Sequence, residues 1–239
     1  MGVSPRSNIR DVASHRYFYS PPDGQQAVER AIGELEGPWI ELQDELLRRS
    51  AVRSERKGPL SRKLFYKRDK EDLAGAVTLQ LVRTTRVRER LGVADTERAR
   101  EAHAAFMVDP TTVSLAPMMT SGIWTLGAND PDQTGHMLYT SDHPVCVIPD
   151  HSAAPEGYGR VGSFIFPLSP TRILLIYAPG CSPFPRERDG WMVPLNLDDV
   201  VWCNTLQANS AERAVVSCSD DFRIAKTVRA KRRIESQRH

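Results

Sequence analysis

The spacing of apolar side chains predicts a long helix near the start of the chain. The apolar positions after Pro22 recur every three or four residues: Val28, Ile32, Leu35, Trp39, Leu42 and Leu46. This spacing lines one face of a helix, and Asp23 followed by Gln26 has the pattern of a capping box at its start. Because Gly37 and Pro38 interrupt the stretch, we expect the helix to kink or to split in two there.

A second helix is predicted over residues 70–91. Its inner stripe is formed by Leu73, Val77, Leu81, Thr84 and Val87. Gln80 and Arg83 lie near one another on this helix, on or beside the stripe, because residues three apart share a helix face. We expect a third helix to begin at Asp95 or Thr96.

After Pro110 the pattern changes to short apolar runs separated by Gly, Pro, Asn and Asp, which is typical of strands. Candidate strands cover residues 122–126, 137–139, 145–148, 163–167 and 172–177. The run Ile173-Leu174-Leu175-Ile176 is the most continuously apolar, so we expect it to form a central strand that is buried on both faces. A long loop is expected over residues 179–190.

Both kinds of element return near the C-terminus. Asp198 is expected to cap a helix that runs to about Ala208, residues 214–217 resemble a further strand, and Asp220 or Asp221 should cap a terminal basic helix. The order of elements predicts an α+β fold, in which a helical N-terminal half packs on a mixed or antiparallel sheet formed by the C-terminal half. We expect a single domain over residues 1–239, with a mainly helical part (1–109), a strand-rich part (110–218) and a basic C-terminal helix or tail (219–239).

The composition is typical of a soluble globular protein. Of the 239 residues, 40% are hydrophobic and 26% are charged, so extensive disorder is not expected. No apolar run approaches the roughly 18–20 residues that cross a bilayer, and the N-terminus lacks the apolar stretch of a signal peptide. These features predict a cytoplasmic protein without a membrane span. Its four cysteines, none in a C-x-x-C pair, are expected to be reduced thiols.

The net charge of +2 conceals a strong segregation of charge along the chain. Residues 53–90 carry 12 basic and 5 acidic side chains, residues 223–239 carry 7 and 1, and residues 91–222 carry 7 and 16. The two basic segments, 53–90 and 223–239, are therefore candidate nucleic-acid surfaces. Alternatively, they are solvated faces that dock on the acidic body, which the absence of aromatic side chains from residues 223–239 favours.

The main candidate for a site is the polar stretch Thr140-Ser141-Asp142-His143-Pro144. Asp and Ser side chains before a proline commonly form turns by hydrogen bonding to the nearby backbone, so the stretch can be purely structural. Alternatively, Asp142 at the end of a strand can act as a general base or bind a divalent metal ion, with Ser141 and His143 contacting substrate and His136 assisting. Both interpretations remain open at this point.

Three residues elsewhere complete the candidate set. Arg83 has the two-pronged guanidinium that binds phosphate, and Gln80 shares its helix face. Equally, Arg83 can pair with Asp142 or with a backbone carbonyl and fix the helix on the sheet. Asn204 can bind substrate, or it can cap or cross-link neighbouring segments through its amide. The sequence contains no Gly-rich phosphate loop, no G-x-S-x-G elbow, no H-E-x-x-H, no helix-turn-helix and no zinc finger.

Four stretches of the chain also carry short motifs in a defined order. They are Tyr17-Phe18-Tyr19 with Val28-Glu29 and Glu34-Leu35-Glu36-Gly37; Leu79-Gln80-Leu81-Val82-Arg83-Thr84; Tyr139-Thr140-Ser141-Asp142-His143-Pro144-Val145; and Phe166-Pro167-Leu168-Ser169-Pro170 with Asn204 downstream. Together they resemble the bacterial family called domain of unknown function 4238 (DUF4238). They are similar to its aromatic motif and first helix, its Q-x-x-R-T helix, its T-S-D-N-P signature, and its P-L-S-P strand with a later helix asparagine. The resemblance covers roughly residues 9–218.

Two features differ from the family pattern. Members usually begin with an H-x-V-P-x-F stretch upstream of the first helix, and nothing here matches it, so we expect the chain to start after that element. His143 also replaces the usual Asn before Pro144. The family carries no established activity, and the resemblance therefore implies no particular reaction.

Three hypotheses follow for the function. The first is a hydrolase acting on phosphodiesters, nuclease-like and with a defence or toxin role. In it Asp142 is the base or metal ligand, Arg83 the phosphate clamp and Gln80 an orienting group. The second is a non-catalytic module that binds nucleic acid or protein, in which the same residues form an internal polar network and the basic tail contacts the partner. The third is a truncated, inactive relative.

Overall fold

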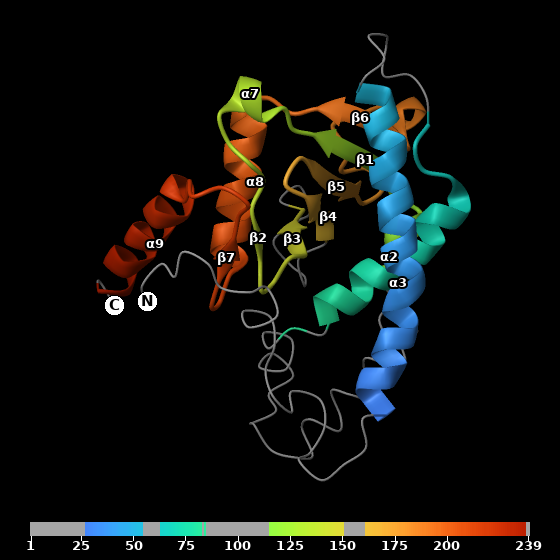
Figure 1. Cartoon of the computed structure of the whole chain (residues 1–239), viewed down its shortest axis with the longest axis horizontal. Coiled ribbons are helices and arrows are strands. Elements are labelled where there is room, and N and C mark those ends of the chain that lie inside the picture. Colours follow the sequence, from blue (N-terminus) through green and yellow to red (C-terminus); the bar gives the residue numbers. More distant parts are fainter. Residues whose placement is uncertain (1–26, 55–62, 83, 85–114, 151–160, 238–239) are drawn as a thin grey trace. The chain divides into compact units, whose positions relative to one another are not determined.

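The computed structural model describes residues 27–54, 63–82, 84, 115–150 and 161–237 (Figure 1). The chain divides into two compact units, with a boundary between Gly122 and Ile123. We call the described residues before this boundary the helical unit and those after it the sheet unit, and each is described by itself. Helices at the N-terminal end, followed by a sheet with further helices, confirm the predicted α+β class.

The helical unit contains α2 (Ala27–Ser54), α3 (Lys67–Val82) and the short α6 (Leu115–Thr120), which the sequence did not predict. α2 passes through Pro38 as one helix, so the considered split at this position does not occur. Pro38 removes only one backbone donor, and the turns on both sides of it retain their own hydrogen bonds over a helix of 28 residues.

α3 begins at Lys67 rather than at the predicted Lys70. The backbone N–H of Tyr66 donates to Oδ2 of Asp69 at 2.9 Å, so Asp69 closes the first turn of the helix. Arg49 of α2 donates to the same carboxylate oxygen at 2.9 Å and thereby joins α2 to α3. The predicted third helix, and residues 83 and 85–91 of the second, lie outside the described residues.

The sheet unit is built on a mixed five-stranded sheet in the order β3-β4-β5-β1-β6. Its strands are β1 (Ile123–Ala128), β3 (Cys146–Pro149), β4 (Val161–Ser169), β5 (Arg172–Tyr177) and β6 (Trp191–Pro194). Neighbouring strands are antiparallel except β1 and β6, which run parallel. β5 is the central strand and its four inner residues are all buried, as its apolar run predicted.

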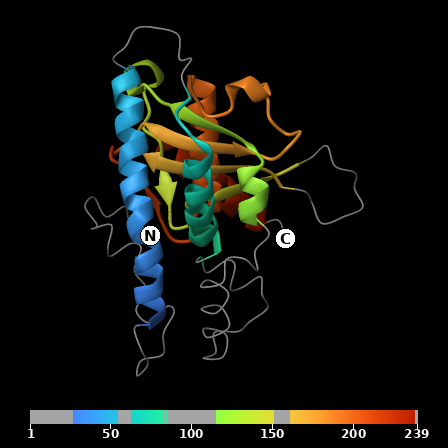
Figure 2. The same ribbon diagram turned by 90° about the vertical axis from the view of Figure 1, so that its right-hand side faces the viewer.

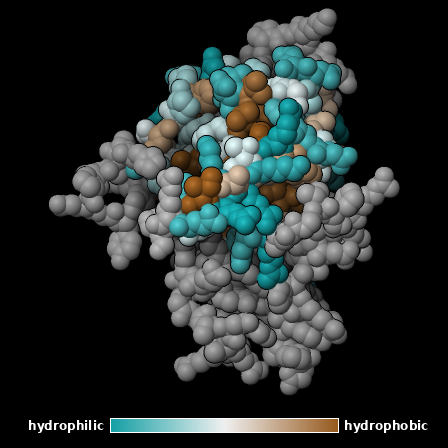
Figure 3. All heavy atoms as spheres, turned by 90° about the vertical axis from the view of Figure 1, so that its left-hand side faces the viewer, coloured by the Kyte–Doolittle hydropathy of each residue, from teal (hydrophilic) through white to brown (hydrophobic). Residues whose placement is uncertain are grey.

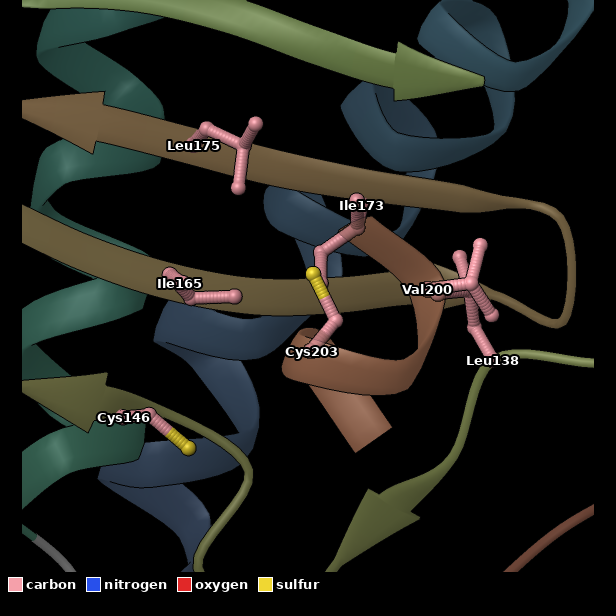
Figure 4. Close-up of a cluster of buried hydrophobic side chains, with 7 residues drawn as sticks. All are labelled: Leu138, Cys146, Ile165, Ile173, Leu175, Val200 and Cys203. Atoms are coloured by element: carbon pink, nitrogen blue, oxygen red, sulfur yellow. The ribbon is translucent and has the colours of Figure 1, made fainter. Parts of the chain in front are cut away.

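A helix covers one face of this sheet and forms the core with it. α8 (Leu197–Ser210) lies along the sheet in Figures 1 and 2. In Figure 4, Val200 and Cys203 of α8 point towards the side chains of the sheet. The buried cluster consists of Leu138, Cys146, Ile165, Ile173, Leu175, Val200 and Cys203. Because burying one aliphatic side chain contributes about 1.5–3 kcal/mol, this cluster fixes α8 on the sheet.

Several predicted boundaries were wrong. The backbone of residues 137–139, predicted as a strand, is instead hydrogen-bonded to the side chain of Asn204. The strand here is the two-residue β2 (Thr140–Ser141), which pairs with β7 (Val215–Val216). β6, α7 (Pro131–Thr134) and the 3-10 helix η2 (Arg186–Arg188) were not predicted, because elements of three or four residues carry too little apolar pattern.

The two C-terminal helices are present where expected, with different caps. α8 begins after Asn196 instead of Asp198, because Asn196 and Asp199 exchange hydrogen bonds of 2.9 Å in a capping box. α9 (Arg223–Ser236) begins after Phe222, and Oδ1 of Asp221 accepts from the N–H of Arg223 at 3.1 Å. Within the described ranges, no helix is long and apolar enough to cross a membrane.

Candidate functional site

Residues 140–144 lie beside the segment that follows α8. In the β2–β7 pair Ser141 is opposite Val215, and the N–H of Asp142 donates to the carbonyl of Ala214 at 3.2 Å. Backbone pairing therefore fixes the polar turn against the segment 211–216.

The carboxylate of Asp142 binds the backbone of this same segment. Its Oδ1 accepts from the N–H of Glu212 at 3.1 Å, and its Oδ2 accepts from the N–H of Arg213 at 2.8 Å. These bonds favour the structural interpretation of Asp142 as a turn residue. A carboxylate has about four lone-pair positions, however, so each oxygen retains one that a further ligand can use.

His143 and Glu212 lie next to this carboxylate. His143 is only 4% exposed, and its Nε2 lies 3.1 Å from Oε2 of Glu212. One ligand atom each from Asp142, His143 and Glu212 lies within 4.8 Å of the others, and among the described residues this group could hold a metal ion. Glu212 is 70 positions from Asp142 and belongs to no recognisable motif, so the sequence alone gives no sign of its place in this group.

Asn204, a candidate substrate-binding residue, is fully buried in α8. Its Oδ1 accepts from the N–H of Tyr139 at 2.7 Å, and its Nδ2 donates to the carbonyl of Met137 at 2.8 Å. The amide therefore cross-links α8 to the segment before the turn, which was the structural alternative for this residue.

Ser141 makes its contacts inside the protein as well. Its hydroxyl lies 3.0 Å from Oε1 of Gln207 and 2.9 Å from the carbonyl of His143. Gln207 is fully buried, and its Nε2 donates to the carbonyl of Pro144 at 2.8 Å. Gln207 was not recognised from the sequence, although it lies three residues after Asn204 and so on the same side of α8.

The two candidates from the helical unit are not brought into this group by any described contact. Gln80 is buried in α3, and its Nε2 lies 3.4 Å from Oε1 of Glu36. Arg83 lies outside the described residues. The expected convergence of Gln80 and Arg83 with Asp142 stays a prediction.

His136, considered as an assisting residue, contacts the start of α9. Its Nδ1 lies 2.9 Å from Oδ2 of Asp221, and Arg223 donates to both oxygens of the same carboxylate at 2.9 Å. The hydrogen bonds from the Arg223 side chain hold the pKa of Asp221 well below its ordinary value, and those from the Arg223 backbone and His136 act in the same direction. Tyr139 donates its hydroxyl to the carbonyl of Asp221 at 2.6 Å.

α9 presents basic side chains on the face away from its buried side. Val228 is its buried residue, and Figure 1 shows α9 lying beside α8. Lys226, Arg229 and Arg233 are exposed, and their spacing of three and four residues places them on one face. We call these three residues the cationic stripe. Within the described ranges none of them is in an ion pair. Figure 3 views this side of the molecule and shows mainly hydrophilic residues among the coloured atoms.

Arg232 differs from the stripe residues, because its guanidinium donates to the backbone carbonyls of Asn209 and Ala211 at the end of α8. This side chain therefore anchors α9.

All four cysteines are free thiols. Burial raises the pKa of Cys203 to about 12, with a smaller contribution from Asp199. Cys203 therefore remains a protonated core residue at neutral pH and is not an activated nucleophile.

One comparison with known proteins gives a match over part of the chain. Residues 117–221 match the model of the family described as Protein of unknown function (DUF4238). This segment contains β1 to β7 and α8, and it confirms the predicted resemblance there, whereas the two earlier stretches of motifs precede it. α9 follows directly after the match. No curated protein and no solved structure matches the chain.

Proposed function

We propose that this protein is a non-catalytic nucleic-acid-binding module whose cationic stripe on α9 contacts phosphate groups. The observation that carries this proposal is the set of three exposed basic side chains on one helix face, which the described residues leave without ion-pair partners. Buried or paired basic residues would offer no such surface.

The polar turn supports the non-catalytic alternative. The side chains of Ser141 and Asn204 make their hydrogen bonds to the protein itself. Residues whose polar groups are already satisfied gain little by binding a substrate.

The stripe suits contact with phosphates more than contact with bases. Its three residues span seven positions, about 10 Å along the helix axis. The sequence of α9 contains no Phe, Trp or Tyr, and Phe222 just before it packs against the Tyr139 ring at 5.8 Å. Because α9 itself has no aromatic ring for base stacking, we expect its binding to depend on charge and not on sequence.

Fluorescence anisotropy with a labelled DNA duplex tests this proposal. We expect Arg229→Gln/Arg233→Gln to weaken binding, because each guanidinium replaces counterions at a phosphate. Arg186→Gln/Arg188→Gln removes two exposed charges from the sheet unit and is the matched control, which should bind like the wild type. An equal loss in both variants, or in neither, contradicts a role of the stripe. Stronger binding of polyglutamate than of DNA would identify an acidic protein as the partner instead.

A phosphodiester hydrolase is the second candidate, and the Asp142, His143 and Glu212 group favours it. In this alternative, water attacks the phosphorus atom, Asp142 accepts the water proton, and the bond to the leaving oxygen breaks.

Hydrolysis of bis(p-nitrophenyl) phosphate with Zn²⁺, Mn²⁺ or Mg²⁺ distinguishes the two candidates. A hydrolase loses turnover in Asp142→Asn while its melting temperature changes little. Absent turnover in the wild type, together with a clear fall in the melting temperature of Asp142→Asn, agrees with a turn residue.

A further inference from the structure

We propose that Asp142, His143 and Glu212 form a binding site for a divalent transition-metal ion of the zinc class. The three residues come from two segments that are adjacent in space: Asp142 and His143 follow β2, and Glu212 follows α8. This inference does not depend on nucleic-acid binding by α9.

The donor set selects the kind of ion. Two carboxylates and one imidazole provide oxygen and nitrogen ligands, and an imidazole nitrogen favours Zn²⁺, Fe²⁺ or Ni²⁺ over Mg²⁺ and Ca²⁺, which prefer oxygen. A divalent cation also balances the charge of the two neighbouring carboxylates. Three protein ligands leave a position for water, as in open zinc sites.

The distances are close to those of a metal site. Metal–ligand bonds of about 2.0–2.1 Å in tetrahedral geometry place neighbouring ligand atoms about 3.3 Å apart. Nε2 of His143 and Oε2 of Glu212 are already 3.1 Å apart, and the three ligand atoms lie within 4.8 Å of one another. The side chain of Glu212 is 41% exposed, so it can close the remaining gap without repacking the core.

The backbone of the site is fixed before any ion binds. Asp142 holds the N–H groups of Glu212 and Arg213 through its own carboxylate, and its backbone bonds to Ala214. The side chain of His143 is only 5% exposed, whereas that of Glu212 reaches solvent. The ligands therefore start from a restricted geometry with one side open to water, which lowers the entropic cost of binding an ion.

Metal titration of the untagged, full-length protein tests the site. The protein is treated with a chelator and dialysed, and Zn²⁺ or Co²⁺ is then added while binding is followed by calorimetry and visible absorption. We expect one ion per chain, bound more tightly than Mg²⁺. The Co²⁺ spectrum should contain no thiolate charge-transfer band, because none of the ligands is a cysteine.

Two variants and a control decide between this site and any other. Glu212→Gln replaces an exposed side chain by one of the same size. It should weaken Zn²⁺ binding at least about tenfold, because even mutations of residues that only hydrogen-bond to a metal ligand weaken binding by this much. His143→Asn should do the same. Glu187→Gln, an exposed acid elsewhere in the sheet unit, should bind like the wild type.

The melting temperature provides a second readout. Zn²⁺ should raise it for the wild type and for Glu187→Gln but not for Glu212→Gln, because an ion that binds only the folded state stabilises that state. Unchanged affinity in Glu212→Gln, a thiolate band with Co²⁺, or no saturable binding would overturn the proposal. DNA binding by Arg229→Gln/Arg233→Gln tests only the proposed function of α9, so its loss would leave the metal-site proposal unaffected.

Discussion

Single buried amides determine the path of the chain on either side of the polar turn. Asn204 binds the backbone at Met137 and Tyr139, and Gln207 binds the carbonyl of Pro144. Both amides are fully buried, and the bond from the Tyr139 N–H to Asn204 is buried as well, so these groups depend on one another for hydrogen bonding.

Replacement of Asn204 by Ala should therefore be costly. We expect Asn204→Ala to lower the free energy of unfolding by about 2–4 kcal/mol, because it removes the partner of the buried Tyr139 N–H and of the half-buried Met137 carbonyl. Asn209→Ala, an exposed position on the same helix, should change it by less than about 0.5 kcal/mol. Urea unfolding followed by circular dichroism measures both, and similar values for the two variants would contradict this role of Asn204.

The sequence named Ser141, Asp142, His143 and Asn204 as candidate site residues but did not identify their partners. Gln207 and Glu212 lie 66 and 70 positions from the residues that they contact. Local spacing carries no information about contacts at that separation, because the fold alone brings the segments together.

At the scale of elements, the strength of the apolar pattern decided which predictions succeeded. β5 has the predicted bounds, because its four consecutive buried residues reflect a central strand. β2 and β7 contain two residues each, which is too short for an apolar pattern to predict. Residues 137–139 form a short apolar run like that of a strand, but Asn204 binds the carbonyl of Met137 and the N–H of Tyr139.

Replacement by alanine is expected to have opposite effects at two glycines, Gly127 in β1 and Gly75 in α3. A Cβ at Gly127 would lie 2.7 Å from Cγ2 of Ile173 and 2.9 Å from Cδ2 of Leu195. We expect Gly127→Ala to destabilise the protein by about 1–3 kcal/mol through overpacking. A Cβ at Gly75 in α3 meets nothing within 4 Å, so Gly75→Ala should stabilise it by about 0.5–1 kcal/mol. Thermal unfolding of both variants checks the signs, and a stabilising Gly127→Ala would contradict the close contact.

The start of α9 predicts a dependence of stability on pH. Because Arg223 lowers the pKa of Asp221 in the folded state, Asp221 stabilises the protein fully above its ordinary pKa of about 3.9. This stability is lost as the pH falls below that value towards the folded-state pKa. Asp221→Asn should therefore be less stable than the wild type at pH 7, and the difference should shrink by pH 3. Urea unfolding measures it, with Asp220→Asn as the exposed control, and a difference independent of pH would contradict the pairing.

At the scale of the whole molecule, charge is the property that the sequence predicted most directly. The basic segment 223–239 contains α9, whose stripe is exposed, whereas much of segment 53–90 lies outside the described residues. The predicted meeting of Arg83 with Asp142 required the arrangement of two separate units, which composition and periodicity do not determine.

The salt dependence of DNA binding measures how the two basic segments share the contacts. Each phosphate contact with duplex DNA contributes about 0.9 to the slope of log K against log salt. We expect Arg229→Gln/Arg233→Gln to reduce this slope by about 1.8. A slope that remains in the double variant would come from other basic residues, with segment 53–90 first among them. An unchanged slope would show that the stripe contacts no phosphates.

The two edge strands of the main sheet, β3 and β6, are poorly suited to pairing with a further strand. β3 and β6 have four residues each and end in Pro149 and Pro194, and the register of β3 shifts between Ile148 and Pro149. A proline offers no N–H to an incoming chain, and a short or irregular border gives it little length to pair with. Self-association by edge-to-edge growth, the first step towards fibrils, is therefore disfavoured at either margin.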